Sequence, residues 1–415
     1  MKRIAIVIFS FPKLSESFIV SKFLSLLDEG WDVHFVCVRS DPREWRRFPD
    51  LTRRPELRHR VHVTWPSSPR WLVALLMTFS LAWCALRTPR ALSDYLRRGV
   101  KRFETGILRK LYMDAEMVAL DADLIHFEFG TIAAERMRLK ELLNSKLVVS
   151  FRGYDITYAG LEDPSYYAEV WERSDALHLL GGALWREAQR RGCPPEKLHA
   201  LIPPAVDLGF FDPGDRQQAR RGGGDDRPFR ILSVGRLNWA KGYEYGLAAP
   251  RILRDRGVIF ECGIIGSGDF LEAIAFARRQ MGLDGVVHLW GPQPRDEVKA
   301  RMLWADVMLH SATAEGFCNA VIEAQAMKLP IVCTDAHGLR ENIADGETGF
   351  AVPRRNPNAL ADKLELLAQD ANLRQRMGDA GRRRALAEYQ LNDQAKAFSR
   401  LYSTVLGESN SEALH

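Results

Sequence analysis

Two kinds of hydrophobic pattern alternate along the first 150 residues of the chain. Residues 3–10 form a short apolar run typical of a strand buried on both faces, and residues 33–38 form a second. Between them, residues 17–29 carry apolar side chains at helical spacing, and Gly30 ends the predicted helix. Further strands are expected at 123–129 and 146–151. This alternation predicts a parallel sheet with helices on both faces.

The same alternation restarts after residues 220–226, where three glycines lie between charged residues. Such a segment is typical of a flexible linker. Beyond it, strands are expected at 229–234, 260–265, 286–289, 307–310 and 330–334, and helices at 248–255 and 271–280. The sequence therefore predicts an α/β protein with two doubly wound, Rossmann-like domains facing across a cleft, with ligands at the carboxyl ends of the strands.

A hydrophobic segment at residues 71–86 departs from this pattern, since only Thr78 and Ser80 are polar. A helix of this length spans roughly 24 Å, which is short of a bilayer core of about 30 Å, so a spanning helix fits poorly. Residues 87–110 then contain eight lysines and arginines against Asp94 and Glu104. One interpretation is a buried helix followed by a solvated basic helix. The other is a surface that lies on an anionic membrane.

Composition and charge narrow the functional classes without selecting one. The chain has 415 residues, 46% hydrophobic and 27% charged, which is typical of globular domains. Its formal net charge of +5 is small for this length, and no motif indicates nucleic-acid binding. Six widely spaced cysteines without a C-x-x-C pair indicate reduced thiols in the cytoplasm. The apolar N-terminal run lacks a small-residue cleavage site, so we expect a strand there and not an export signal.

Candidate chemistry is strongest at residues 315–324, EGFCNAVIEA, which follow a predicted strand and open a predicted helix. Gly316 lets the backbone approach a ligand closely. The free amides at the start of the helix form a site for an anion. Glu315 and Glu323, with seven residues between them, can each accept hydrogen bonds from sugar hydroxyls. By itself, the same pattern would also fit an ordinary exposed helix start.

Two further loops follow strands of the same predicted sheet. In SVGRLNWAKG, at 233–242, Gly235 permits a tight exit from the strand, and Arg236 and Lys241 offer positive charge to phosphate oxygens. In IGSGD, at 265–269, Gly266 again follows a strand. Because the carboxyl ends of parallel strands meet at one edge, the three loops predict a pocket for a sugar joined to a diphosphate.

The motifs VGRLNWAKG, IIGSGD, EGFCNAVIEA and GLRENIADGETGF resemble those of retaining glycosyltransferases of family 4, which have the GT-B fold. The N-terminal FPKLSESFI is similar to the sub-group that builds exopolysaccharide, colanic-acid-like and lipopolysaccharide chains. The resemblance implies an acceptor-binding domain at 1–205 with a helical insert at about 66–112, a linker at 206–227, a nucleotide-sugar-binding domain at 228–385, and a closing helix at 386–415 that returns to the first domain.

The resemblance also implies roles for individual residues. Arg236 and Lys241 would hold the donor diphosphate and stabilise the charge that grows on the leaving group. Glu315 would bond the hydroxyls of the transferred sugar, and Glu323 those of the ribose. Backbone amides at 317–320 would meet the distal phosphate. The donor-binding set is completed by Gly235, Gly266, Gly316, Phe317, Cys318, Asn319 and Ala320.

The acceptor side departs from the family pattern. Ser15, Glu16 and Ser17 would help to close the site. Many relatives have His-Gly-x-Asp where this chain has Arg152, Gly153, Tyr154 and Asp155. Arginine stays protonated and only donates hydrogen bonds, so Arg152 would bind phosphate or an anionic acceptor. His126 is the nearby alternative for a catalytic histidine, or else it is a buried structural residue.

The resemblance implies a hexosyltransferase-type enzyme that uses a nucleotide-diphosphate sugar and retains the anomeric configuration. No metal or other cofactor is expected, because side chains and helix ends supply the positive charge. The acceptor would be a growing surface polysaccharide or a lipid-linked glycan, and nucleic acid is not expected as a partner. The expected location is the cytoplasm, or the inner face of the cytoplasmic membrane. A nucleotide-sugar 2-epimerase and a non-catalytic sugar-nucleotide-binding subunit are the alternatives on this scaffold.

Overall fold

The computed structural model describes residues 2–13, 16–66, 68–103, 106–214 and 227–408. The chain divides into two compact units. The first unit consists of Met1–Leu179, Trp185–Ile202 and Asn392–His415, and the second of Leu180–Leu184 and Pro203–Leu391. The glycines of the predicted linker, at 222–224, lie outside the described residues.

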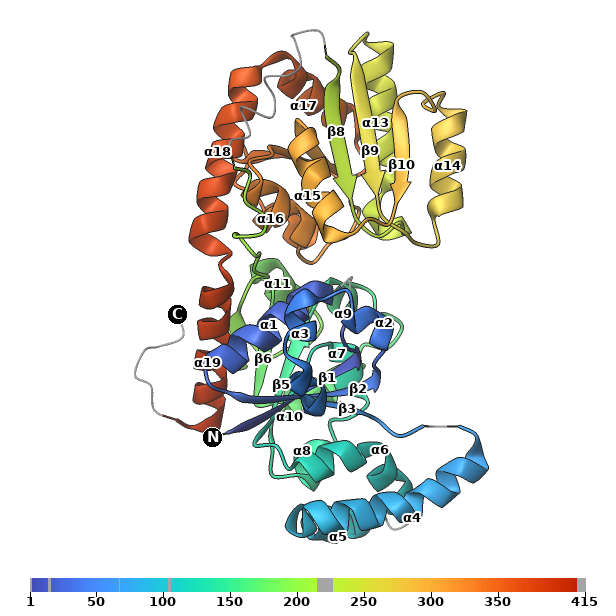
Figure 1. Ribbon diagram of the computed structural model, residues 1–415, viewed down its shortest axis with the longest axis vertical. Helices are drawn as coiled ribbons and strands as arrows, with labels where there is room; N and C mark the ends of the chain where they lie inside the picture. The colour runs from blue at the N-terminus through green and yellow to red at the C-terminus, as the bar shows by residue number, and fades with distance from the viewer. Residues whose placement is uncertain (1, 14–15, 67, 104–105, 215–226, 409–415) are drawn as a thin grey trace. The chain divides into compact units, whose positions relative to one another are not determined.

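The described part of the first unit contains a parallel seven-stranded sheet in the order β3-β2-β1-β4-β5-β6-β7 (Figure 1). Its strands are β1 (Arg3–Ser10), β2 (Asp32–Arg39), β3 (Val61–Val63), β4 (Leu124–Phe127), β5 (Lys146–Phe151), β6 (Ala176–Leu179) and β7 (His199–Leu201). The strand β1 pairs with β2 on one side and with β4 on the other, so the strand order reverses direction between β1 and β4. Its residues 4–8 are buried, as a central strand covered on both faces requires.

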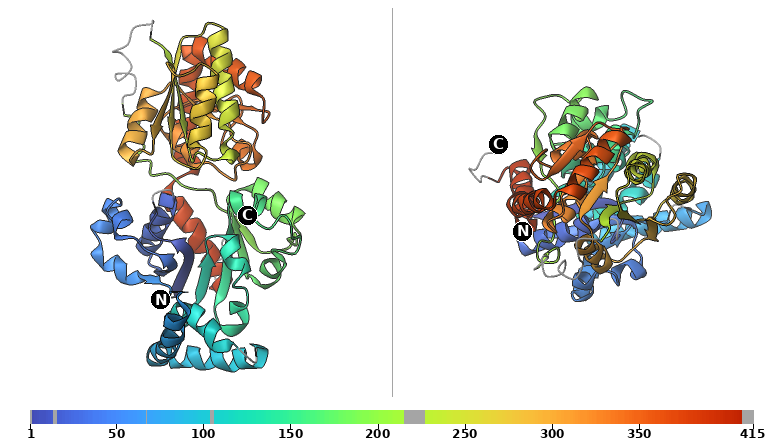
Figure 2. Two further views of the ribbon diagram at one scale, coloured as in Figure 1. Left: turned by 90° about the vertical axis from the view of Figure 1, so that its right-hand side faces the viewer. Right: turned by 90° about the horizontal axis from the view of Figure 1, so that it is seen from above.

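Helices lie on both faces of this sheet (Figure 2). The helices described in this unit are α1 (Ser17–Asp28), α2 (Pro42–Trp45), α3 (Pro49–Thr52), η2 (Pro55–Arg60), α4 (Arg70–Arg87), α5 (Pro89–Phe103), α6 (Ile107–Leu120), α7 (Gly130–Ala134), α8 (Leu139–Leu142), α9 (Gly153–Thr157), α10 (Ala168–Arg173), α11 (Gly182–Arg190) and, late in the chain, α19 (Leu391–Leu406). The helix α19 inserts Phe398, Leu401 and Tyr402 into the same core as β1 and α1. Residues from the two ends of the chain therefore share one hydrophobic core.

The described part of the second unit contains a parallel six-stranded sheet in the order β10-β9-β8-β11-β12-β13. Its strands are β8 (Phe229–Val234), β9 (Phe260–Ile265), β10 (Val287–Gly291), β11 (Val307–His310), β12 (Ile331–Thr334) and β13 (Gly349–Val352). Its helices are η3 (Trp239–Lys241), α13 (Tyr243–Asp255), α14 (Leu271–Gln280), α15 (Arg295–Trp304), α16 (Asn319–Ala326), η4 (His337–Glu341), α17 (Pro357–Gln369) and α18 (Ala371–Glu388). Two hydrophobic clusters form the core of this unit, one around Met308 and Ile322 and the other around Ile231 and Leu360.

The strand order of the second sheet reverses between β8 and β11, which lie side by side. Open parallel sheets of this kind bind their ligands at the carboxyl ends of the strands where the order reverses. We therefore expect a ligand-binding site at the loops that follow β8 and β11.

The segment from residue 206 was expected to begin the linker. In the structure Val206 pairs with Gln390, and Phe211 is buried in the core around Met308. Residues 203–214 thus pack on the second unit because they bring their own apolar side chains to its core.

The hydrophobic segment at 71–86 forms α4, which packs against α6 and leaves much of its apolar surface in solvent. One interpretation of the sequence required a helix that is buried on all sides, and the exposed side chains of α4 contradict it. Within the part of the chain that the structure describes, no helix is long and apolar enough to cross a membrane.

Candidate functional site

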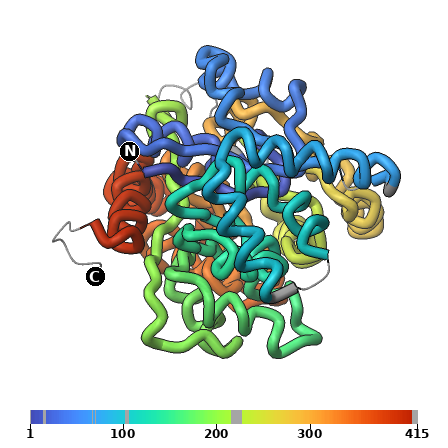
Figure 3. The backbone as a smooth tube through the Cα atoms, turned by 90° about the horizontal axis from the view of Figure 1, so that it is seen from below, coloured from blue at the N-terminus to red at the C-terminus, as the bar shows by residue number. Residues whose placement is uncertain are grey.

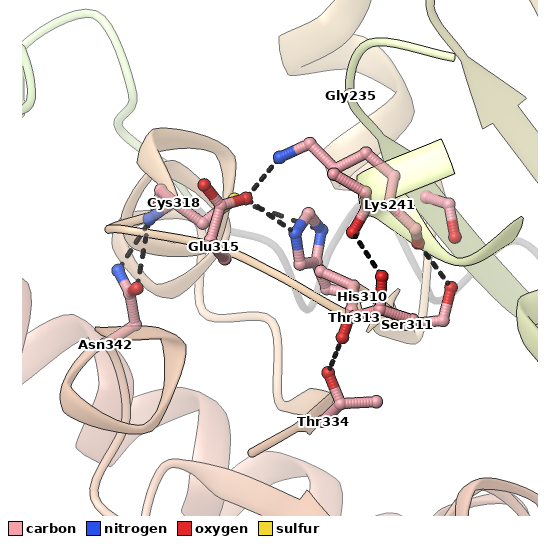
Figure 4. Close-up of polar contacts among 12 residues, drawn as sticks. Gly235, Lys241, His310, Ser311, Thr313, Glu315, Cys318, Thr334 and Asn342 are labelled. Carbon is pink, nitrogen blue, oxygen red and sulfur yellow. Dashed lines mark hydrogen bonds and ion pairs between the residues drawn. The ribbon is translucent and has the colours of Figure 1, made fainter. Parts of the chain in front are cut away.

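The loops after β8 and β11 bring two predicted site residues into direct contact. The ammonium group of Lys241, at the end of η3, forms an ion pair with the carboxylate of Glu315 (Figure 4). Backbone contacts hold the two loops together, since Thr313 N donates to Ala240 O over 2.8 Å and Ser311 Oγ donates to Lys241 O over 3.1 Å. The carboxylate and the ammonium group thus occupy the edge of the sheet where the strand order reverses.

The glycines of these loops let two pairs of backbone segments approach each other. A Cβ atom on Gly266 would lie 1.8 Å from the carbonyl oxygen of Gly235, so the loops after β8 and β9 fit together only without a side chain. A Cβ atom on Gly338, in η4, would lie 1.7 Å from the carbonyl oxygen of Gly316. The loop that carries Glu315 therefore rests directly on the segment after β12.

His310, the last residue of β11, contacts the same carboxylate as Lys241. Its Nε2 lies 3.2 Å from Glu315 Oε2, and its side chain is 5% exposed. Burial disfavours the charge of Glu315, but Lys241 and His310 outweigh burial and lower the pKa of Glu315 to about 2. For Lys241, burial is likewise outweighed by the carboxylate of Glu315, and its pKa is raised. Glu315 is thus held as an anion and Lys241 as a cation.

One atom each of His310, Glu315 and Cys318 lies within 4.8 Å of the others, which raises the question of a metal site. The ring of His310 turns Nε2 toward Glu315 and Nδ1 toward Cys318 Sγ, at 3.9 Å. Opposite ring nitrogens cannot bind one ion, and the ammonium group of Lys241 already occupies the carboxylate. The contacts instead form a chain from Cys318 through His310 and Glu315 to Lys241.

Asn342 is a site residue that the sequence reasoning did not identify. Its side-chain oxygen accepts a hydrogen bond from Cys318 N over 3.0 Å, and its amide nitrogen donates to Cys318 O over 3.2 Å (Figure 4). Asn342 is fully buried, and its own carbonyl accepts a hydrogen bond from Gln325. It therefore fixes the residue that precedes α16. Its position in the motif GLRENIADGETGF was the available signal, but nothing in the spacing connects it to Cys318.

This contact changes one expectation about the phosphate site. The Cys318 amide was expected to meet a phosphate, but it is already bonded to Asn342. The first residues of α16 are Asn319 and Ala320, whose amides have no backbone acceptor within the described residues. The phosphate-binding amides in the predicted range 317–320 would thus exclude that of Cys318.

The remaining donor-side residues differ in their surroundings. Arg236 is exposed at the exit of β8, and Phe317 is half-buried with its ring 6.0 Å from that of Tyr389. The carboxyl group of Glu323, in α16, has no hydrogen bond or ion pair within the described residues, and burial raises its pKa to about 7 although Arg295 opposes this. A half-buried carboxyl without a protein partner is suited to bind hydroxyl groups of a ligand.

Replacement of Gly338 by alanine should damage the site more than the fold. The added methyl group would overlap the carbonyl of Gly316 and displace the loop that carries Glu315. The cost to the stability of the fold is only about 1–3 kcal/mol, as for other packing strain of this kind. We expect at least tenfold weaker binding of the nucleoside diphosphate product, measured by isothermal titration calorimetry. Gly285→Ala is the control, because its added methyl group would meet nothing within 4 Å. Equal affinities for both variants would contradict this role of Gly338.

In the first unit, a buried charge cluster lies after β4 and β5. Glu128 is fully buried, and its two carboxylate oxygens bind Lys22 Nζ and Arg152 Nη2, each over 2.6 Å. Arg152 was expected to bind phosphate or an anionic acceptor. Its guanidinium group is already paired with Glu128, and only 12% of its side chain is exposed.

His126 lies beside this cluster and is fully buried. Its Nδ1 lies 2.6 Å from the hydroxyl of Tyr402, and its Nε2 lies 2.7 Å from Ser150 Oγ. Burial and the nearby ammonium group of Lys22 lower its pKa well below the ordinary value. The structure favours the second interpretation of this residue, a neutral histidine that holds α19 to the sheet, over a catalytic one.

The structure describes the other residues expected on the acceptor side only in part. Asp155 is fully buried, and its oxygens accept hydrogen bonds from the amides of Arg152 and Thr131, so it joins the starts of α7 and α9. Glu16 forms an ion pair with Lys13 over 2.8 Å. Ser15 lies outside the described residues, and of Ser17 only its place as the first residue of α1 is described.

Comparison with known proteins places this geometry in a family. Residues 215–384 match the family model for glycosyl transferases group 1. The amylovoran biosynthesis glycosyltransferase AmsK of Erwinia amylovora is 29% identical over 383 residues, which cover 86% of this chain and 89% of the relative. The putative colanic acid biosynthesis glycosyltransferase WcaL of Escherichia coli is 25% identical over 88% of this chain and 91% of the relative.

Solved structures share the architecture. A sucrose-phosphate synthase from Thermosynechococcus elongatus superposes with a TM-score of 0.72 at 19% identity, over 99% of this chain and 100% of the other. HepE of Anabaena, solved in complex with UDP-glucose, gives a TM-score of 0.72 at 14% identity, over 97% of this chain and 100% of the other. The solved structures show that the two doubly wound units have the GT-B fold, and the match over residues 215–384 and the full-length relatives make the chain similar to group 1 glycosyltransferases.

Proposed function

We propose that this glycosyltransferase moves a sugar from a nucleoside-diphosphate donor to the acceptor of an exopolysaccharide pathway, either a growing glycan or a lipid-linked one. The observation that carries the donor side is the ion pair of Lys241 and Glu315 at the point where the strand order of the second sheet reverses. AmsK and WcaL are named for amylovoran and colanic acid biosynthesis, which supports the class of acceptor.

The site offers a separate group to each part of such a donor. The exposed guanidinium of Arg236 and the ammonium of Lys241 would bind the diphosphate, together with the free amides of α16. Glu315 would accept hydrogen bonds from the sugar, and Glu323, which has no protein partner in the described residues, from the ribose. HepE was solved with UDP and UDP-glucose, so uridine donors are the first to test.

We propose retention of the anomeric configuration through attack on the same face of the sugar. The bond between the anomeric carbon and the diphosphate oxygen breaks as the acceptor oxygen forms its bond to that carbon. The acceptor's proton passes to the leaving phosphate, so no protein base is needed, in keeping with the buried state of His126. Lys241 and Arg236 stabilise the negative charge that grows on the diphosphate, and no metal ion is required.

Transfer reactions with UDP-, GDP- and ADP-sugars, followed by NMR of the product's anomeric proton, test this proposal. We expect one donor class to react, the donor's anomeric configuration to persist in the product, and activity to remain within about twofold when EDTA is present. An inverted product would overturn retention, and loss of activity in EDTA would overturn the metal-free assignment. Donor binding without transfer or hydrolysis would point to a non-catalytic subunit instead.

A further inference from the structure

The helix α4 exposes one continuous apolar face. The exposed fractions of its outer side chains are 70% for Trp71, 64% for Leu75, 59% for Phe79 and 86% for Leu86. These positions recur every four to seven residues, and the exposed residues between them include Ala74 and Ala82. On a helix this spacing places them in one stripe, about 22 Å long at 1.5 Å per residue. We call this stripe the α4 face.

The opposite side of α4 is packed in the ordinary way. Ser80 and Cys84 are fully buried, and Cys84 Sγ donates to Ala115 O of α6 over 3.5 Å. The α4 face is therefore the side that turns away from α6. Single exposed apolar residues are normal on a protein surface, but a contiguous stripe with only Thr78 as a polar member marks an interaction surface.

Positive charge lies at the C-terminal end of α4 and on the neighbouring helix α5. Arg87 ends α4, and the exposed side of α5 carries Arg90, Arg97 and Lys101. Asp94 and Glu104 are the acidic residues in the sequence from 70 to 113. Both helices pack on α6, and the views agree that they form the outer layer of the first unit, beyond the sheet (Figures 1 and 3).

We propose that α4 and α5 dock the protein on a membrane surface that contains anionic phospholipid. The α4 face would enter the boundary between headgroups and acyl chains, with the helix axis along the surface, since α4 does not meet the requirements for crossing it. The arginines and the lysine of α5 would bind lipid phosphates at the same level. Trp71, at the start of the helix, suits the interfacial region, where amphipathic rings collect.

Charge complementarity favours an anionic membrane, and not a second copy of the chain, as the partner of this surface. Two copies that met face to face through α4 and α5 would bring these basic residues against their own equivalents, with few carboxylates to compensate. An anionic membrane offers an apolar interior to the α4 face and negatively charged headgroups to the basic residues of α5.

Vesicle flotation of the full-length protein tests the docking surface. At low salt we expect the protein to float with vesicles of phosphatidylcholine containing phosphatidylglycerol, and to stay largely unbound with phosphatidylcholine alone. The variant Leu75→Glu with Phe79→Glu should bind the anionic vesicles at least tenfold more weakly, because it places two charges in the apolar face. Phe276→Glu is the matched control, since Phe276 is 65% exposed on α14 of the second unit.

A second variant tests the charge without touching α4. Arg97→Glu with Lys101→Glu should weaken binding by about 25-fold or more and flatten its salt dependence, because each basic residue near an anionic surface contributes about fivefold. Circular dichroism confirms that each variant is folded. Failure of the wild-type protein to float, equal binding to neutral vesicles, or equal binding of the α4 variant overturns the proposal. So does a dimer in sedimentation equilibrium that the α4 variant abolishes.

Discussion

Glu315→Ala is expected to lower kcat by two to three orders of magnitude, which corresponds to about 2.7–4 kcal/mol of lost transition-state stabilisation. The variant removes the group assigned to the sugar hydroxyls, and it also leaves Lys241 without its carboxylate partner. Lys241→Ala removes the charge assigned to the leaving diphosphate and should have an effect of the same order. Release of the nucleoside diphosphate, measured with the donor that the screen identifies, gives both rates.

The control for these variants is Glu244→Ala. Glu244 is an exposed glutamate in the first turn of α13, only three residues after Lys241, and it has no assigned role. Glu315→Gln separates charge from shape, because it keeps the side-chain volume and one acceptor oxygen. Near-normal turnover of Glu315→Ala or Lys241→Ala, in protein whose thermal unfolding matches the wild type, would refute the assigned roles.

Glu128→Ala should destabilise the first unit by about 3–5 kcal/mol, because it leaves two buried positive charges, on Lys22 and Arg152, without their shared carboxylate. These two cations hold the pKa of Glu128 far below its usual range although burial opposes its charge. For a unit of this size, the loss corresponds to a fall in Tm of about 6–20 °C. Differential scanning calorimetry of the full chain measures it.

Two further variants make this prediction specific to the ion cluster. Glu135→Ala, at an exposed glutamate just after α7, should change stability by less than about 0.5 kcal/mol. The triple variant Lys22→Met, Glu128→Leu and Arg152→Met should recover most of the loss, because replacing a whole buried ion cluster by apolar residues is often neutral or stabilising. An unchanged Tm for Glu128→Ala would mean that Lys22 and Arg152 are hydrated and do not need the carboxylate.

The sequence predicted the central strands most accurately. The ranges for β1, β5, β8, β9 and β11 agree with the structure residue for residue, because strands buried on both faces are continuous apolar runs. The short strands β3, β6, β7 and β13 were not predicted. Each has only three or four residues, too few for a periodic pattern, and their pairing with a neighbouring strand defines them.

The candidate site was predictable to the extent that it follows from topology. Lys241 and Glu315 meet because their loops follow neighbouring parallel strands, and the sequence shows which residues follow a strand. The contacts of His310 and Asn342 depend on how the loops fold back, which no spacing reveals. For the same reason the pairing of Arg152 with Glu128, 24 positions apart, was not foreseen.

The return of α19 to the first unit sets the order in which the chain can complete its folding during synthesis. The core around β1 includes Phe398, Leu401 and Tyr402, and His126 bonds the hydroxyl of Tyr402. These residues leave the ribosome after the second unit, which ends at Leu391. The first unit is thus begun before the second and completed after it. Until then, the surface of the first unit that α19 covers stays open to chaperones and proteases.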